Sequence, residues 1–230
     1  SASMGGMEWC VVPKRFYFVQ ARRPELPCQC LLVEFEDNVE YLDLEMDGFL
    51  EYFSLRHEFG PMGLSQVIRF IQTIVQEMKR FPNSKIIYIM NSDCRQRLAN
   101  SLFLVGSYMI IQQQCTVQSI AEALEPFADS KIEPFRDAGE GDPDFFITCM
   151  DCWNALAKAL SLGWVGPRSE ITGRWGWYDL DEYEHHDDAS NGNWNVVVPG
   201  ALIAFRGPRR LPHPTSDPHD DAHGRRHFAP

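Results

Sequence analysis

Short apolar runs and longer amphipathic stretches follow one another along most of the chain. Runs rich in β-branched and aromatic residues predict strands, and they lie at 9–12, 15–20, 30–35 and 85–90. The stretch 62–80 carries its apolar residues along one stripe at helical spacing, which predicts an amphipathic helix. Residues 98–111 are apolar almost all round, which is typical of a helix at the centre of a domain.

Two further helices are predicted downstream. Thr116 is a suitable N-cap for a helix over 117–127, and a helix over 145–162 has Gly163 as its expected stop. The strand 85–90 is apolar on both faces, as an interior strand is. Because strands alternate with helices, the pattern predicts an α/β fold in which helices flank a central sheet.

The pattern also predicts how the chain is divided. Residues 1–8 have the composition of a tag or a flexible start, and 9–178 form the predicted α/β domain. The segment 179–208 opens with DLDEYEHHDD, in which six of ten residues are acidic and none is Lys or Arg, and it continues into turn-like and strand-like sequence. We expect it to be an acidic linker that leads to a second domain. Residues 209–230 are rich in Pro, His and charge, which predicts a flexible tail.

Composition limits the possible partners and the compartment. The 230 residues carry a formal net charge of −11, which disfavours a nucleic-acid partner because duplex binding draws on clustered Lys and Arg. No apolar run is long enough to span a bilayer, so no membrane partner is expected. Seven cysteines and no visible secretory signal indicate free thiols in a reducing, intracellular setting, either cytoplasm or nucleus.

Cys149 and Cys152 have the spacing of a zinc pair, but they fall inside a predicted helix, where residues three apart share one face. Small buried core thiols are the better interpretation. We therefore predict no metal site and no cofactor.

The strand at 85–90 is followed by a polar loop, NSDCRQRLANS (91–101), and then by the buried helix. This is where a cysteine phosphatase keeps its phosphate-binding loop. Such a loop needs a nucleophilic thiolate, backbone N–H groups at a helix N-terminus, and an arginine six residues after the cysteine for bidentate contact with the phosphate oxygens.

The loop fails this requirement in both registers. If Cys94 is the nucleophile, the position of the arginine falls on Asn100; if Arg97 is the arginine, the position of the nucleophile falls on Asn91. The loop has no glycine, and Asp93 would repel a phosphate. We expect a degenerate phosphate-binding loop, formed by Asn91, Asp93, Cys94, Arg95 and Arg97, and no catalytic residue, with Cys94 as the one candidate thiol.

Several segments together resemble a known family. They are the FGP turn at 59–61, SDCRQRLANSLFLVGSYMII, PFRDA at 134–138, FFITCMDCW at 145–153, DEYEH at 181–185, NGNWN and VPGALIAFRGP. In this order they resemble the N-terminal domain of the cell-division-cycle dual-specificity phosphatases that act at mitotic exit, the "fourteen" type. The resemblance implies a dual-specificity-phosphatase-like domain that is itself inactive and is followed by a catalytic domain with the active Cys and Arg.

The resemblance also implies a role for the acidic segment. In the family, acids of this segment line a groove that receives basic residues following a phosphoserine-proline site. Carried to this chain, the substrate-binding positions are Glu184, Asp187 and Asn193, of which Asn193 has lost the carboxylate. The expected partners are the C-terminal catalytic phosphatase domain and basic phosphoprotein substrates.

Three functions remain open at this stage. The first is a non-catalytic substrate-docking domain of a Ser/Thr/Tyr phosphatase. The second is an active phosphatase that uses Cys94, and the third is a stand-alone pseudophosphatase that acts as a scaffold.

Overall fold

The structure is a computed structural model, and its described residues are 8–12, 15–21, 39–42, 59–91, 94–127, 132–137 and 142–207, with two short strands at 219–220 and 226–227. The chain divides into two compact units, residues 1–158 and 159–230. The sequence predicts that the α/β domain ends at residue 178. The structure instead places residues 159–178 in the second unit. The predicted strand at 30–35 lies outside the described residues.

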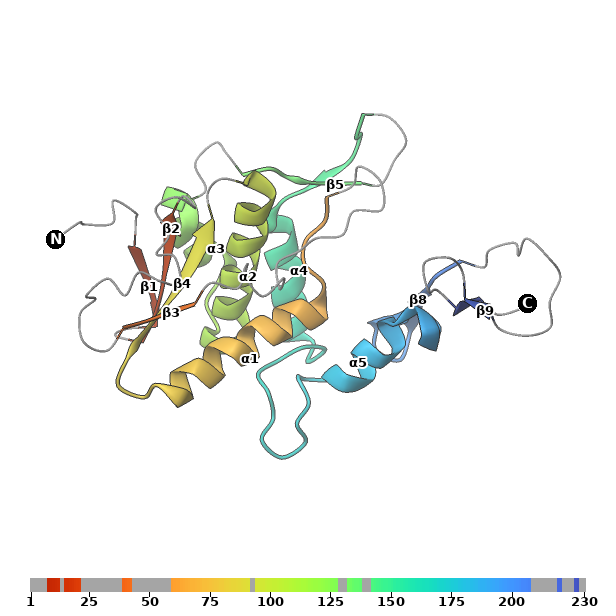
Figure 1. Ribbon diagram of the computed structural model, residues 1–230. Coiled ribbons are helices and arrows are strands. Elements are labelled where there is room, and N and C mark those ends of the chain that lie inside the picture. Colours follow the sequence, from red (N-terminus) through yellow and green to blue (C-terminus); the bar gives the residue numbers. More distant parts are fainter. Residues whose placement is uncertain are drawn as a thin grey trace. The chain divides into compact units, whose positions relative to one another are not determined.

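A four-stranded mixed sheet lies at one side of the first unit (Figure 1). Its strands are β1 (Glu8–Val12), β2 (Phe16–Ala21), β3 (Val39–Leu42) and β4 (Lys85–Asn91), in the order β1-β2-β4-β3. β1 pairs with β2 antiparallel, while β2 and β3 both run parallel to β4. β4 therefore lies inside the sheet, which confirms its prediction as an interior strand from its two apolar faces.

The helices of the first unit are α1 (Leu64–Arg80), α2 (Arg95–Gln113), α3 (Val117–Leu124) and most of α4 (Cys149–Ser161), whose last three residues are assigned to the second unit. Every residue of α2 from Leu98 to Ile111 is buried, which confirms it as the central helix. In Figure 1, α2 lies between the sheet and α4, and the Trp153 indole of α4 donates to the Phe103 carbonyl of α2 at 3.2 Å. Thr116 caps α3 as expected, since its side chain accepts from the Ser119 N–H.

The helix predicted over 145–162 begins later than expected. Phe146 instead pairs with Arg136, in a two-stranded ladder of β5 (Phe135–Arg136) and β6 (Phe146–Ile147). Thr148 and Asp151 then form a reciprocal cap: the Asp151 carboxylate accepts from the Thr148 N–H at 2.8 Å, and the Thr148 hydroxyl accepts from the Asp151 N–H at 3.2 Å. This capping box sets the start of α4 at Cys149.

In its described part the second unit holds the helix α5 and two two-stranded antiparallel sheets, β7-β8 and β9-β10. Its elements are α5 (Leu180–Asp187), a short 3-10 turn η3 (Ala189–Asn191), β7 (Trp194–Val198), β8 (Leu202–Phe205), β9 (His219–Asp220) and β10 (Arg226–His227). A second 3-10 turn, η2 (Glu125–Phe127), belongs to the first unit. The predicted linker segment 179–208 is thus folded as a helix and a hairpin up to Gly207, and its role as a connection to another domain stays a prediction.

No helix in the described part of the chain is long and apolar enough to cross a membrane.

Candidate functional site

The loop after β4 leads directly into α2. Asn91 is the last residue of β4, paired in register with Ala21, and Cys94 is the N-cap of α2, with its carbonyl accepting from the Leu98 N–H at 2.9 Å. Arg95 is exposed and Arg97 is half-buried in the first turn of the helix. Asp93 lies outside the described residues. The predicted strand before the loop and the predicted buried helix after it are therefore confirmed.

Asn100 occupies the position where the arginine of a phosphate-binding loop would stand if Cys94 were the nucleophile. It is 1% exposed, and both ends of its amide are engaged. Its Oδ1 accepts from the Met62 N–H at 2.9 Å, and its Nδ2 donates to the Gly60 carbonyl at 3.3 Å. Asn100 therefore fixes the chain segment that enters α1, which is a structural role.

Of the two cysteines of α4, Cys149 is confirmed as a buried core thiol, whereas Cys152 is half-buried. Cys149 is buried, and its Sγ lies 3.5 Å from the Ala99 carbonyl of α2. Burial, and secondarily the neighbouring Cys152, raises the pKa of Cys149 to about 12, so the thiol keeps its proton. In the part of the chain that the structure describes, no three His, Cys, Asp or Glu side chains lie close enough together to hold a metal ion.

The acidic segment forms α5, and its sequence explains why. The Asp179 carboxylate accepts from the Asp181 and Glu182 N–H groups at 3.1 Å, which caps the helix N-terminus. Acids in the first turn and histidines in the last turn also suit the helix dipole. The helix ends at Asp187.

The three predicted substrate-binding residues lie close in the chain, and the structure links two of them. Asn193 has a left-handed backbone, with φ of 48°, and its Nδ2 donates to the Asp187 carbonyl at 3.0 Å. The Asp187 carboxylate in turn accepts from Asn195 Nδ2 at 2.7 Å. Glu184 is half-buried one turn earlier on α5. The loop residues belong to the first unit and these three to the second.

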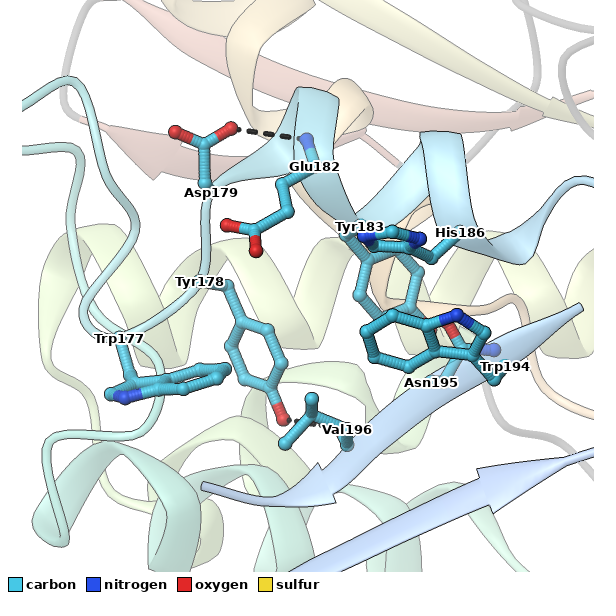
Figure 2. A pocket seen from close by; sticks show the side chains of 9 residues that line it. All are labelled: Trp177, Tyr178, Asp179, Glu182, Tyr183, His186, Trp194, Asn195 and Val196. Carbon is cyan, nitrogen blue, oxygen red and sulfur yellow. Dashed lines mark hydrogen bonds between the residues drawn. The ribbon is translucent and has the colours of Figure 1, made fainter. Parts of the chain in front are cut away.

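The other face of α5 lines a pocket that the sequence analysis did not identify (Figure 2). We call it the aromatic pocket, and it is lined by Trp177, Tyr178, Asp179, Glu182, Tyr183, His186, Trp194, Asn195 and Val196. The four residues from α5 and its cap are spaced 179, 182, 183 and 186, which is one helical face. That spacing could have indicated the pocket from the sequence. It was missed because six of the ten residues in this segment are acidic, which is typical of a solvated surface.

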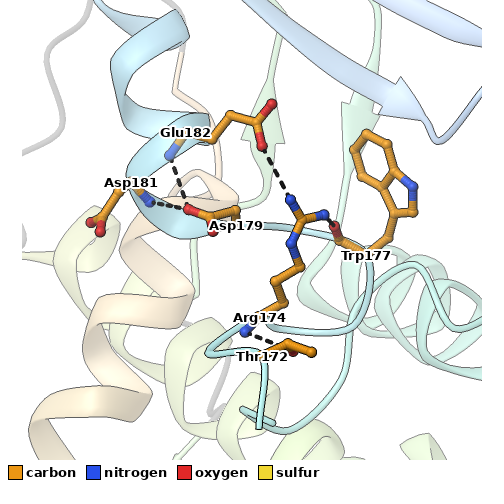
Figure 3. Close-up of polar contacts among 6 residues, drawn as sticks. All are labelled: Thr172, Arg174, Trp177, Asp179, Asp181 and Glu182. Carbon is orange, nitrogen blue, oxygen red and sulfur yellow. Dashed lines mark hydrogen bonds and ion pairs between the residues drawn. The ribbon is translucent and has the colours of Figure 1, made fainter. Parts of the chain in front are cut away.

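Some polar groups in the wall of this pocket are engaged, while two buried atoms, Asn195 Oδ1 and His186 Nδ1, have no hydrogen-bond partner among the described residues. The Tyr178 hydroxyl donates to the Val196 carbonyl at 2.9 Å, and the His186 ring stacks on Trp194 with centroids 4.0 Å apart. His186 is therefore a packing residue. Figure 3 shows the Glu182 carboxylate facing Arg174, whose Nη2 lies 3.6 Å from Oε2 and whose Nη1 donates to the Trp177 carbonyl. Both side chains are exposed, so this ion pair contributes at most about 1 kcal/mol.

Burial of Tyr183 in the wall of this pocket should lower the stability of the folded chain at alkaline pH. Burial, then Asp187 and Tyr178, raise the pKa of Tyr183 from 10.0 to about 12. Below about pH 10 both folded and unfolded chains keep the proton; between about pH 10 and 12 only the folded state does, so the unfolded state is favoured. We expect the wild-type chain to lose more unfolding free energy from about pH 9 to about pH 11 than Tyr183→Phe does, as measured by urea denaturation. Equal losses in the two proteins would contradict the assignment.

Comparison with known proteins gives a consistent family match. The model of the family described as "Dual specificity protein phosphatase, N-terminal half" matches residues 10–159, nearly the extent of the first unit. The human "Dual specificity protein phosphatase CDC14C" is 38% identical over 173 residues, covering 74% of this chain and 36% of that protein.

Two further relatives extend the match. The mouse "Dual specificity protein phosphatase CDC14B" is 37% identical over 165 residues, covering 71% of this chain and 32% of its own. The "Tyrosine-protein phosphatase CDC14" of Saccharomyces cerevisiae is 30% identical over 179 residues, covering 76% of this chain and 30% of its own. The chain thus spans about a third of the length of these relatives.

Proposed function

Since the chain belongs to the CDC14 family of dual specificity phosphatases, as a domain of the N-terminal-half type, we propose that it docks substrates without catalysing their hydrolysis. In this proposal it helps to select phosphoserine-proline sites followed by basic residues, and a second domain of the same protein removes the phosphate. The observation that carries the proposal is the state of Asn100.

A cysteine phosphatase holds its substrate with an arginine that closes the phosphate-binding loop. Here the closing position relative to Cys94 holds Asn100, whose amide is buried and bonded to the backbone at Met62 and Gly60. The Asn100 side chain carries no positive charge, and its hydrogen bonds to the backbone give it a structural role. The loop follows a strand and precedes a helix, as a phosphate-binding loop does, but its sequence lacks the pair of residues that perform the chemistry, which supports a degenerate loop.

The first test is hydrolysis by the chain itself. We expect the purified chain to release no phosphate from an aryl phosphate or from a phosphoserine-proline peptide, and Cys94→Ser to leave this result unchanged. Release of phosphate that disappears in Cys94→Ser would establish the chain as an active phosphatase that uses this thiol. Release that survives the substitution would come from a contaminant or from another site of the chain; repurification distinguishes the two, and release that persists after it would contradict the proposal.

The docking half of the proposal rests on α5. Asp179–Asp188 carries six carboxylates and no Lys or Arg, so this segment contributes −6 of the formal charge of −11. A surface of one sign attracts peptides of the opposite sign and favours their encounter. Glu184 and Asp187 keep carboxylates at the positions that the resemblance assigns to the groove. The test of this docking role is how strongly a two-domain enzyme prefers basic peptides to alanine peptides, with and without these carboxylates.

Asn193 is expected to contribute by position and not by charge. Its amide donates to the Asp187 carbonyl, and its left-handed backbone turns the chain from η3 into β7. In this role it holds the end of α5, and therefore Asp187, in place.

The β7–β8 hairpin supports the existence of a partner domain. All four residues of β8 are exposed, and three of them are large and apolar: Leu202 and Ile203 at 54% and Phe205 at 70%. A two-stranded hairpin with apolar residues on both faces of one strand is marginal by itself and needs further packing. We propose that the second domain supplies that packing.

A further inference from the structure

We propose that Asn195 is a positioning residue for substrate selection, because its amide fixes the direction of the Asp187 carboxylate. The inference deepens the docking proposal and rests on it, since that proposal assigns Asp187 to the groove that receives basic residues. In this role Asn195 acts through Asp187 and makes no contact with the substrate.

The contact between the two side chains is a charge-assisted hydrogen bond. Asn195 Nδ2 donates to Asp187 Oδ1 at 2.7 Å, a short distance that is typical of a bond to an ionised acceptor. Asp187 is the last residue of α5 and is exposed to solvent. An exposed carboxylate without such a bond samples several rotamers. The bond from Asn195 therefore reduces the side-chain entropy that is lost when a basic residue binds.

Asn193 and Asn195 hold different parts of Asp187. Asn193 Nδ2 donates to the backbone carbonyl of Asp187 at 3.0 Å, whereas Asn195 donates to the carboxylate. Asn193 therefore fixes the end of the helix, and Asn195 fixes the charged group that the helix carries. The second of these contacts bears directly on the direction from which a cation is received.

Asn195 lies on a strand that is itself held in place. β7 pairs with β8, and the Val196 carbonyl accepts from the Tyr178 hydroxyl at 2.9 Å. The Trp194 ring stacks on His186 of α5, with ring centroids 4.0 Å apart. Figure 2 shows Asn195 on β7 beside Trp194, with His186 above them in the view. A donor on such an element holds its acceptor more precisely than a donor on a loop does.

The surroundings of Asn195 offer the amide little besides Asp187. Its neighbours in the strand WNVVV are aromatic or β-branched, the residue types that strands favour, whereas asparagine is depleted in strands. Its Oδ1 is buried and has no hydrogen-bond partner among the described residues. The aromatic pocket that it lines offers about 30 Å³, room for a water molecule. The bond to Asp187 is therefore the contact that accounts for an amide at this position.

The test is a double-mutant cycle in a two-domain enzyme. Its readout is the ratio of kcat/KM for a phosphoserine-proline peptide followed by lysine to that for its alanine counterpart. Asn195→Val removes the donor and suits a strand, and we expect it to lower the ratio about two- to fivefold, with kcat/KM for the alanine peptide unchanged. In an Asp187→Asn background the same change should have no further effect, because the charge that Asn195 positions is gone.

Two more variants make the result specific. Asn195→Ala removes the same donor without adding branches, and it should lower the ratio as Asn195→Val does. Asn191→Val is the matched control, because Asn191 is exposed and its amide contacts His185. The control should leave the ratio unchanged. A ratio that falls equally in Asn191→Val would overturn the proposal.

Urea denaturation of the 230-residue chain separates positioning from a purely structural role. The unfolding midpoint of Asn195→Val should equal or exceed that of the wild type, because valine is favoured in strands. An unchanged ratio, a lower ratio accompanied by a lower midpoint, or the same effect with and without Asp187→Asn would each overturn the proposal. If Asp187→Asn alone leaves the ratio unchanged, the docking proposal fails too. If Asp187→Asn lowers the ratio and Asn195→Val does not, only the positioning role fails.

Discussion

Replacing Gly106 by alanine is expected to lower the unfolding free energy of the first unit by about 1–3 kcal/mol or more. Gly106 lies within α2, where the Trp153 indole of α4 packs directly on its backbone. A Cβ at this position would stand 2.4 Å from Trp153 Cε2 and Nε1, well inside van der Waals contact. Trp153 cannot move away freely, because it is 5% exposed and its Nε1 donates to the Phe103 carbonyl.

Helix propensity alone would raise the stability of Gly106→Ala, so a loss of stability would show that Trp153 packs on this position. Alanine in a helix interior is favoured over glycine by about 1 kcal/mol, so Gly106→Ala would stabilise the protein if nothing packed there. Gly207→Ala is the matched control, since a Cβ at Gly207 meets nothing within 4 Å among the described residues. Urea denaturation should show a lower midpoint for Gly106→Ala alone. An unchanged or higher midpoint would mean that α2 and α4 do not pack as described.

Replacing Phe205 by alanine should have very different effects in the short chain and in a longer protein that includes the second domain. In this chain Phe205 is 70% exposed, so the change should alter stability by less than about 0.5 kcal/mol. If the second domain covers β8, the same change in the longer protein should cost about 3–5 kcal/mol, the range for a buried phenylalanine.

Phe146 provides the control for that comparison. It is also a large exposed side chain, at 51%, but it lies in β6 of the first unit. Phe146→Ala should have the same small effect in both proteins. If Phe205→Ala costs equally little in both, as judged by denaturant unfolding of the domain that contains it, the hairpin is not part of the contact between the domains.

The elements that the sequence predicts well are those whose signal is local. The stripe of apolar residues in α1, the unbroken apolar surface of α2 and the N-cap Thr116 each depend on neighbouring residues only, and each is confirmed. The start of α4 was predicted too early. Phe145 and Phe146 fit an apolar helical pattern, but Phe146 is drawn into pairing with Arg136, which is ten residues away.

At the candidate sites, too, the sequence predicts what depends on neighbouring residues and misses what depends on contacts between distant segments. That Asn100 cannot serve as an arginine follows from the sequence, whereas its bonds to Met62 and Gly60 depend on how α1 and α2 meet. The aromatic pocket was missed because it joins one face of α5 to Trp177 and to β7. A segment with six acids in ten residues is typical of a solvated surface, and only the helical geometry brings Tyr183 and His186 to one face beside the aromatic residues of other segments.

The central claim is that this domain selects substrates through carboxylates of α5 while another domain performs the chemistry. Exposed ion pairs contribute about 0.2–1 kcal/mol each, so removing two should reduce a preference for basic peptides by about two- to thirtyfold. The appropriate protein contains this domain and a catalytic second domain. Glu182→Gln serves as the control for loss of a charge, since Glu182 lies on the other side of the helix.

The deciding measurement is the ratio of kcat/KM for a phosphoserine-proline peptide followed by lysine to that for its alanine counterpart. The account predicts that the wild-type two-domain enzyme and Glu182→Gln share a high ratio, and that Glu184→Gln combined with Asp187→Asn lowers it, with little change in kcat/KM for the alanine peptide. The same ratio in all three enzymes would contradict the account, because these carboxylates would then take no part in substrate selection.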